Sequence, residues 1–303
     1  MVSEESIYGR LLEVEDEIIE LTRRLIRIPS LNPPGDMSDI QGFLGDYFSS
    51  IGLKFNMYEP EKGRITLHLV TGDGGGEYIH LNGHIDVVPI GVRDKWSVDP
   101  FSGEIIDGYI YGRGASDMKA GVAVLIKVFE VIDRYWDDLP VKIGLSIVPD
   151  EETGGRFGSR YLARELNLRP RYLIISEPST IYKVEVGEKG IYHYTVRVEG
   201  RPAHAAFSPY IGDNAILRLM RIIEDLYGLT RLNVETPEDL IDVVEESGNY
   251  VAELFGDDGL RDLYKRITCN VGVIRGGDKV NVVAPWAEAE VDMRIPPGLN
   301  SMI

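Results

Sequence analysis

The chain has 303 residues, of which 44% are hydrophobic and 27% charged, as is ordinary for a globular protein. Its 49 acidic and 32 basic residues give a net charge of −17, which argues against a nucleic-acid or anionic-membrane partner. A single cysteine, Cys269, excludes an internal disulfide and a thiolate metal cluster. The lack of an apolar signal core or an 18-residue apolar run predicts a cytoplasmic protein with no membrane span.

The first group of predicted elements alternates strands with helices. This pattern is typical of an α/β layer built on a mostly parallel sheet. Hydrophobic periodicity and turn residues predict helices over 11–28, 37–51, 117–135 and 157–166, strands over 53–58, 64–70, 78–88, 141–148 and 172–176, and a hairpin arm near 107–112.

The pattern changes from about residue 187. The stretch "IYHYTVRVEG" (191–200) alternates apolar and polar residues, as a half-exposed strand does. A helix over 212–227 and strands over 267–275 and 287–295 follow, which indicates an α+β region. Because 303 residues exceed what one core usually fills, we predict two domains, 1–186 and 187–303.

Polar residues end several apolar runs of the first region. In open α/β sheets, ligands bind beyond the carboxyl ends of the strands. Carboxylates gathered there would repel one another unless cations lay between them, and nitrogen and oxygen donors without thiolate suit Zn²⁺, Co²⁺ or Mn²⁺. The sequence therefore predicts a site for a pair of divalent metals formed by these residues: His84 with Asp86, Asp117, Glu151 with Glu152, and Glu177.

Each of these residues also has an ordinary structural interpretation when it is taken alone. The alternatives are a hydrogen-bonded pair closing a strand (His84 and Asp86), a helix cap (Asp117), solvated loop charges (Glu151 and Glu152) and a turn acid before a proline (Glu177). Four such coincidences at one edge of one sheet are improbable, so we favour the metal-site hypothesis.

Seven motifs carry a family resemblance over about residues 10–300. They are, in chain order, "GHIDVVP", "GRGASDMKAG", "PDEETGG", "SEPS", "RPAHAAFSP", "GGDKVNVVAP" and "DMRIPPG". The chain resembles the aminoacylase / acetylornithine deacetylase / succinyl-diaminopimelate desuccinylase family of di-zinc amidohydrolases and peptidases. This resemblance implies a zinc-peptidase-like catalytic domain, an α+β dimerisation (lid) domain that forms a homodimer, and two divalent metals per active site.

The resemblance also implies roles for the residues at the strand ends. The implied ligands are His84 and Glu177 at the first metal, Asp117 between the two metals and Glu152 at the second, with Asp86 holding the His84 ring and Glu151 as general base. Physical reasoning agrees with the last role, because a carboxylate left unligated beside metals can take a proton from water.

In the second domain, the resemblance implies that His204 stabilises the oxyanion in the partner's active site. A surface histidine after a Gly-Arg-Pro turn is the alternative for this residue. Asn281 would contact the substrate, and Arg294 would bind a substrate carboxylate, with Arg275 a weaker candidate.

One departure from the family concerns the second metal. The family adds a late histidine from a segment that closes the catalytic domain, whereas this chain has no histidine after His204. We therefore expect a chain truncated relative to the family, with both domains incomplete and the second metal site weakened or absent. Two hypotheses follow: a metal-dependent hydrolase of amide bonds in N-acyl amino acids or small peptides, or a non-catalytic dimerising relative with a partial metal site.

Overall fold

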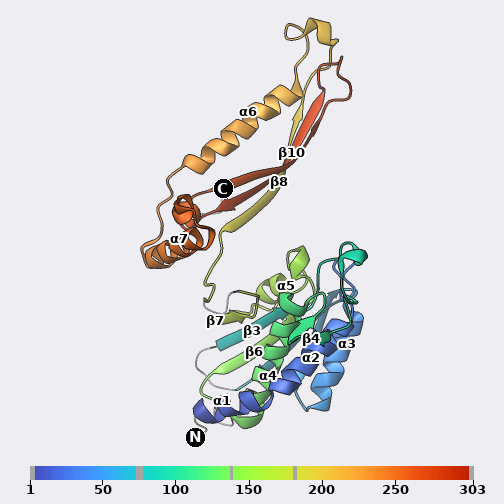
Figure 1. The fold of residues 1–303 in the computed structure, drawn as a ribbon, viewed down its shortest axis with the longest axis vertical. Helices are drawn as coiled ribbons and strands as arrows, with labels where there is room; N and C mark the ends of the chain where they lie inside the picture. Colours follow the sequence, from blue (N-terminus) through green and yellow to red (C-terminus); the bar gives the residue numbers. More distant parts are fainter. Residues whose placement is uncertain (1–3, 73–77, 137–138, 180–182, 300–303) are drawn as a thin grey trace. The chain divides into compact units, whose positions relative to one another are not determined.

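The computed structural model describes residues 4–72, 78–136, 139–179 and 183–299. The chain divides into two compact units, Met1–Lys183 and Val184–Ile303, which Figure 1 shows in blue to green and in yellow to red. Each unit has its own sheet and its own buried core. Within the described residues, every helix is too short or too polar to cross a bilayer.

The first unit contains a five-stranded sheet in the order β1-β2-β6-β3-β7 and a small hairpin. Its elements are α1 (Glu4–Glu13), α2 (Glu15–Arg27), α3 (Ser38–Ser50), β1 (Phe55–Glu61), β2 (Arg64–Thr71), β3 (Tyr78–His84), β4 (Glu104–Ile106), β5 (Tyr109–Tyr111), α4 (Ala120–Tyr135), β6 (Lys142–Val148), α5 (Ser159–Arg164) and β7 (Tyr172–Ile175).

The predicted α/β fold class is confirmed, and the sheet is mixed. Strands β6, β3 and β7 run parallel to one another, whereas β1 and β2 pair antiparallel and β2 pairs antiparallel with β6. The tight connection between β1 and β2 forces a hairpin, because only antiparallel strands can be joined by so short a turn. Parallel pairing is thus confined to the three strands that carry the predicted site residues.

One face of this sheet holds the core of the unit. Helices α2, α3 and α4 pack against the alternate residues of β2, β3 and β6 that point to this face, such as Leu67, Leu81 and Leu145. Gly83 lets α4 approach β3 closely, since a side chain there would press on Val122. Helix α2 accounts for most of the helix predicted over 11–28, but a break at Val14, marked by neither Gly nor Pro, separates it from α1.

The second unit is a three-stranded antiparallel sheet, in the order β8-β10-β9, with helices. Its α-helices and strands are β8 (Gly190–Glu199), α6 (Ala215–Gly228), α7 (Ile241–Phe255), β9 (Thr268–Gly276) and β10 (Trp286–Ile295). Leu219 of α6 packs on Val198, Ala289 and Val291 of the sheet to form a small core. Helix α7 was not predicted. It packs on residues 258–265, and Gly248 permits the contact because a side chain there would collide with the backbone of Arg261.

Candidate metal centre

Three parallel strands bring the predicted residues to one edge of the first unit's sheet. In the register of β3 and β6, His84 is opposite Val148, so the two strands end together. Glu151 and Glu152 follow β6 in a short turn, Glu151–Thr153. On the other side of β3, the register pairs Asn82 with Ile175, the last residue of β7. The carboxyl ends of these strands therefore place a histidine and three glutamates at the same edge, Glu177 being two residues past β7.

Asp117 reaches this edge from a different kind of element. It lies in an irregular turn, Ala115–Lys119, before α4, and its own backbone angles (φ −117°, ψ 100°) are not helical. The sequence placed it at a helix start; the helix begins three residues later. Gly121, in the first turn of α4, lies against Ser176, and a side chain there would collide with the Ser176 carbonyl group. This close approach brings the segment that carries Glu177 beside the segment that carries Asp117.

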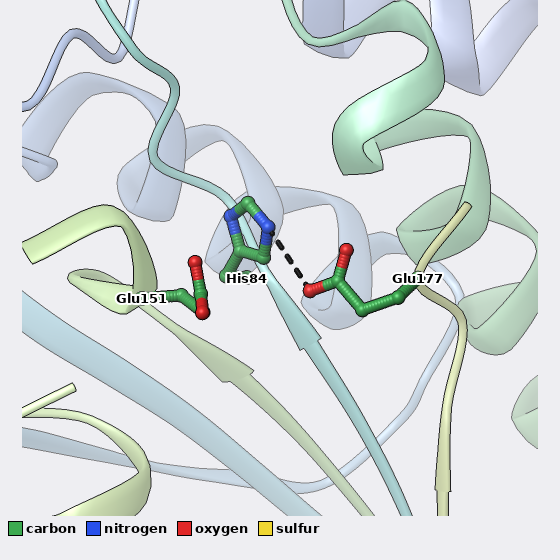
Figure 2. Close-up of side chains that lie close together, drawn as sticks. All are labelled: His84, Glu151 and Glu177. Atoms are coloured by element: carbon green, nitrogen blue, oxygen red, sulfur yellow. Dashed lines mark ion pairs between the residues drawn. The ribbon is translucent and has the colours of Figure 1, made fainter. Parts of the chain in front are cut away.

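The side chains meet around the imidazole of His84. Its Nε2 lies 3.0 Å from Asp117 Oδ1 and 3.3 Å from Glu177 Oε1. Figure 2 shows the carboxyl groups of Glu151 and Glu177 on either side of the ring. Two groups of side chains each offer donor atoms that lie within 4.8 Å of one another. The first group is His84 with Glu151 and Glu177, and the second is His84 with Asp117 and Glu152. His84 belongs to both groups and is the centre of the cluster.

Asp86 is fully buried just past the end of β3. The His84 Nδ1–H donates to the Asp86 backbone carbonyl at 2.9 Å, and the Asp86 carboxylate is farther away, at 3.4 Å. That carboxylate instead accepts the backbone N–H groups of Glu151 at 3.0 Å and Glu152 at 3.2 Å. Asp86 thus orients the ring mainly through its carbonyl group, while its side chain fixes the turn that carries both glutamates.

Hydrogen bonds to acids outweigh burial in setting the protonation of His84. Burial alone would lower the pKa of the ring, but its bonds to Asp86 and Glu177 raise the pKa to about 11. Without a cation, the imidazole is therefore protonated at neutral pH and donates from both nitrogens. The Nδ1–H bond to the Asp86 carbonyl selects the tautomer whose Nε2 lone pair can face a metal once the second proton has left.

The two glutamates of the turn hold their protons more tightly than glutamates in water do. Burial, together with the nearby charges of Glu177, Asp86 and Asp117, raises the pKa of the Glu151 carboxyl. Burial and the charge of Asp117 raise the pKa of Glu152 in the same way. Burial is the main cause of both shifts and the neighbouring carboxylates add to it, and a cation among these carboxylates would relieve their mutual repulsion.

The residues present fit a divalent cation by their chemistry. One imidazole nitrogen and four carboxylates converge on a small volume with no thiolate among them, a donor set that suits Zn²⁺, Co²⁺ or Mn²⁺. The one neutralising charge among them is the imidazolium of His84, which a metal would replace. The electrostatics and the donor types therefore point to the same occupant.

The remaining predicted residues all belong to the second unit, where two of them are neighbours. His204 forms an isolated bridge with Val282, and the Ala205 N–H donates to the Asn281 carbonyl at 3.0 Å, so His204 and Asn281 lie on adjacent loops. The Nδ1 of His204 accepts the Ala206 N–H at 3.2 Å. A neutral His204 must then carry its proton on Nε2, the exposed nitrogen that could donate to a ligand.

The two predicted arginines are engaged by acids of their own sheet. Arg294 makes a two-pronged pair with Asp292, with contacts of 2.7 and 2.9 Å, beside a pocket of about 360 Å³. Arg275 pairs with Glu288 at 3.3 Å and with Glu290 at 2.8 Å on the exposed face of the sheet. A substrate carboxylate would have to compete with Asp292 for Arg294, whereas Arg275 forms ion pairs on the surface of the sheet.

Sequence reasoning missed two buried residues that brace the cluster. Lys119, two residues past Asp117, donates to the carbonyls of Leu25 and Ile28 at 2.8 and 2.9 Å, and burial lowers its pKa to about 7. Asn32 donates to the Asp86 carboxylate at 2.8 Å. A lysine directly before the apolar helix α4 was a usable signal, whereas an asparagine in a Pro-rich turn is not.

Curated relatives match this chain at moderate identity. A succinyl-diaminopimelate desuccinylase from Wolinella succinogenes is 34% identical over 202 residues, which cover 64% of this chain and 52% of the relative. A probable carboxypeptidase from Trichophyton verrucosum is 30% identical over 294 residues, which cover 93% of this chain and 59% of the relative. The chain thus spans between half and three fifths of the length of these relatives.

Solved structures show the same fold. A family M20 metallo-carboxypeptidase from Sulfolobus solfataricus superposes with a TM-score of 0.71 at 19% identity, over 94% of this chain and 72% of that chain. A dinuclear metal-binding M20 peptidase from Bacillus subtilis gives a TM-score of 0.57 at 14% identity, over 93% and 65% of the two chains. The model of Peptidase family M20/M25/M40 matches residues 80–272, more than half of the chain. The family resemblance predicted from the motifs is confirmed: this chain belongs to Peptidase family M20/M25/M40.

Proposed function

We propose that the protein is a metal-dependent hydrolase of amide bonds in N-acyl amino acids or small peptides. The observation that carries the proposal is the gathering of four carboxylates around His84, Glu151 with Glu177 in one set of donor atoms and Asp117 with Glu152 in the other. The relatives named as desuccinylase and probable carboxypeptidase support this substrate class, since both names denote removal of a group from an amino acid or peptide.

In this proposal, His84, Asp117 and Glu177 hold the first cation, Zn²⁺ before Co²⁺ or Mn²⁺. Asp117 and Glu152 offer donors to a second. A bound cation supplies Lewis acidity to the attacking water and to the amide carbonyl.

Glu151 performs the proton transfers in the proposed reaction. Its carboxylate takes a proton from the water that attacks the amide carbon, and the same carboxyl group returns that proton to the leaving nitrogen. Its raised pKa suits both steps, because a carboxylate whose pKa lies nearer to the working pH is a stronger base, and its protonated form persists more readily until the proton is returned. Asp86 keeps the Glu151 carboxyl in place through the backbone N–H that it accepts.

The direct test measures amide hydrolysis against cation content. We expect the chain treated with a chelator to be inactive on a panel of N-acetyl and N-succinyl amino acids and dipeptides, and added Zn²⁺ or Co²⁺ to restore turnover of at least one of them. Metal bound per chain is measured in the same samples. A chain that forms dimers but binds neither metal would overturn the proposal in favour of the non-catalytic relative.

We further propose that the second unit dimerises and that His204 acts in the partner's site. The family resemblance supports this, as do the exposed apolar side chains close to His204 in sequence, Phe207, Tyr210 and Ile211. Its Nε2–H would donate to the oxyanion that forms when water attacks the amide.

Mixed dimers test the action of His204 between subunits. We expect His204→Ala and Glu151→Gln each to be inactive alone, and an equimolar exchanged mixture to recover about one quarter of wild-type activity. Half of the dimers are then mixed, and each mixed dimer has one site with an intact Glu151 and a partner's intact His204. A mixture as inactive as its components would contradict the proposal, provided that native mass spectrometry shows mixed dimers.

A further inference from the structure

The loop that follows α2 lies against the segment that carries His84 and Asp86. The Ser30 hydroxyl donates to the Ile85 carbonyl at 2.7 Å, and the Val87 N–H donates to the Ser30 carbonyl at 2.9 Å. The Asn32 N–H in turn donates to the Val87 carbonyl at 2.9 Å. These backbone contacts hold the loop in register with residues 85–87, although more than 50 residues separate the two segments.

The side chain of Asn32 bonds to side chains of the metal centre and its turn, whereas the backbone of its loop bonds to residues 85–87. Its Nδ2 donates to Asp86 Oδ2 at 2.8 Å and to Thr153 Oγ1 at 2.9 Å, and the residue is 2% exposed. An ionised carboxylate can only accept, so the amide nitrogen, not its oxygen, must face Asp86. One amide group thus bridges the acid behind the metal centre and the last residue of the Glu151–Thr153 turn.

Asp86 passes this constraint on to both glutamates. Its Oδ1 accepts the Glu151 N–H, while its Oδ2 accepts both the Glu152 N–H and the Asn32 amide. Loss of the Asn32 bond would leave Asp86 Oδ2 held by the long 3.2 Å contact alone, and would leave the Thr153 hydroxyl with only its 3.5 Å bond to the Asp150 carbonyl. The Asn32 Oδ1 is buried and has no hydrogen-bond partner among the described residues.

We propose that Asn32 is a positioning residue of the metal centre, which acts through Asp86 and Thr153 to aim the carboxyl groups of Glu151 and Glu152. It touches neither substrate nor cation. The role rests on the proposed function, because it presupposes that Glu152 binds a cation and that Glu151 moves a proton. Supporting partners of this kind commonly change metal affinity or turnover by about 10–100-fold when they are removed.

The test compares Asn32→Ala with Ser30→Ala. Both variants remove one buried side chain from the same loop, but of the two side chains only that of Asn32 contacts the Asp86 carboxylate. We expect Asn32→Ala to weaken Co²⁺ binding about tenfold, to alter the visible absorption of the bound Co²⁺, and to lower kcat by a similar factor with KM changed less than about threefold. Ser30→Ala should lower the melting temperature and leave these three quantities within about twofold of wild type.

Thr153→Val is the second variant, in case Asn32→Ala does not fold. It removes one of the two amide contacts, and we expect a smaller loss of Co²⁺ affinity in the same direction, about threefold. The role is overturned if either folded variant at Asn32 or Thr153 loses stability but binds Co²⁺ with wild-type affinity and spectrum. A wild-type chain that binds Co²⁺ but cleaves no amide overturns the proposed function but not the role of Asn32, because the Co²⁺ affinity of the variants still tests that role. A wild-type chain that binds no Co²⁺ overturns both.

Discussion

Glu151→Gln is expected to lower kcat by about 10²–10⁴-fold while Co²⁺ binds with nearly wild-type affinity. The amide is the same size as the carboxyl group and keeps the backbone N–H that Asp86 accepts, so the turn retains its shape. It cannot take a proton from water, and the proton-transfer step is therefore lost. Parallel measurements of turnover and of Co²⁺ affinity on the same protein separate these two properties.

Glu152→Gln is the matched control, because it changes the neighbouring residue of the same turn in the same way. Its backbone N–H also bonds to Asp86, at 3.2 Å, and its carboxyl group belongs to the donor set with His84 and Asp117. We expect this variant to lose cation affinity in addition to activity. Glu151 also belongs to a donor set, with His84 and Glu177. If Glu151→Gln loses Co²⁺ to the same extent as Glu152→Gln, Glu151 is a ligand and not the general base.

The convergence of the site residues could be predicted because it follows from the direction of the strands. Parallel strands end at one edge, so polar residues that follow such strands must meet there, as His84, Glu151 and Glu177 do. The fold class was predictable for the same reason, from strands that alternate with helices. The antiparallel pairing of β2 with β1 and with β6 could not be predicted, since hydrophobic periodicity shows which face of a strand is buried and not the direction of the neighbouring strand.

The contacts that support the site could not be predicted in the same way. Asp86 was expected to hold the His84 ring, but β3 ends at His84 and the chain beyond it turns the Asp86 carboxylate towards the backbone of Glu151 and Glu152. Asn32 reaches Asp86 across 54 residues of sequence. Such contacts depend on how loops pack after the strands have paired, and no local pattern of residue types records this.

The protonation of His84 makes cation binding depend on pH, with a sign that can be worked out. The pKa of about 11 means that the metal-free ring carries two protons at neutral pH, and the proton on Nε2 must leave before that nitrogen can bind a metal. We expect the apparent association constant for Co²⁺ to rise about tenfold per pH unit between roughly pH 6.5 and 8, with about one proton released per cation. Isothermal titration in buffers of different ionisation enthalpy measures both quantities.

The stability of the metal-free chain should change in the opposite direction over a higher range of pH. Because the folded chain raises the pKa of His84 above its ordinary value of 6.5, the protonated ring stabilises the fold fully below pH 6.5, and this contribution is lost as the pH rises towards 11. We therefore expect the free energy of unfolding without metal to fall between pH 7 and 9.5, as measured by urea denaturation. A His84→Asn variant should lose this slope together with its Co²⁺ binding.

The matched control is His193→Gln, which removes an exposed histidine of the second unit, 68% accessible and outside the cluster. It should keep both the pH dependence of Co²⁺ binding and that of metal-free stability. A wild-type association constant that changes by much less than tenfold per pH unit would mean that His84 is already neutral before the cation arrives. The acids around the ring would then be sharing their protons among themselves instead of with His84, and the charge of the metal-free cluster would have to be reassigned.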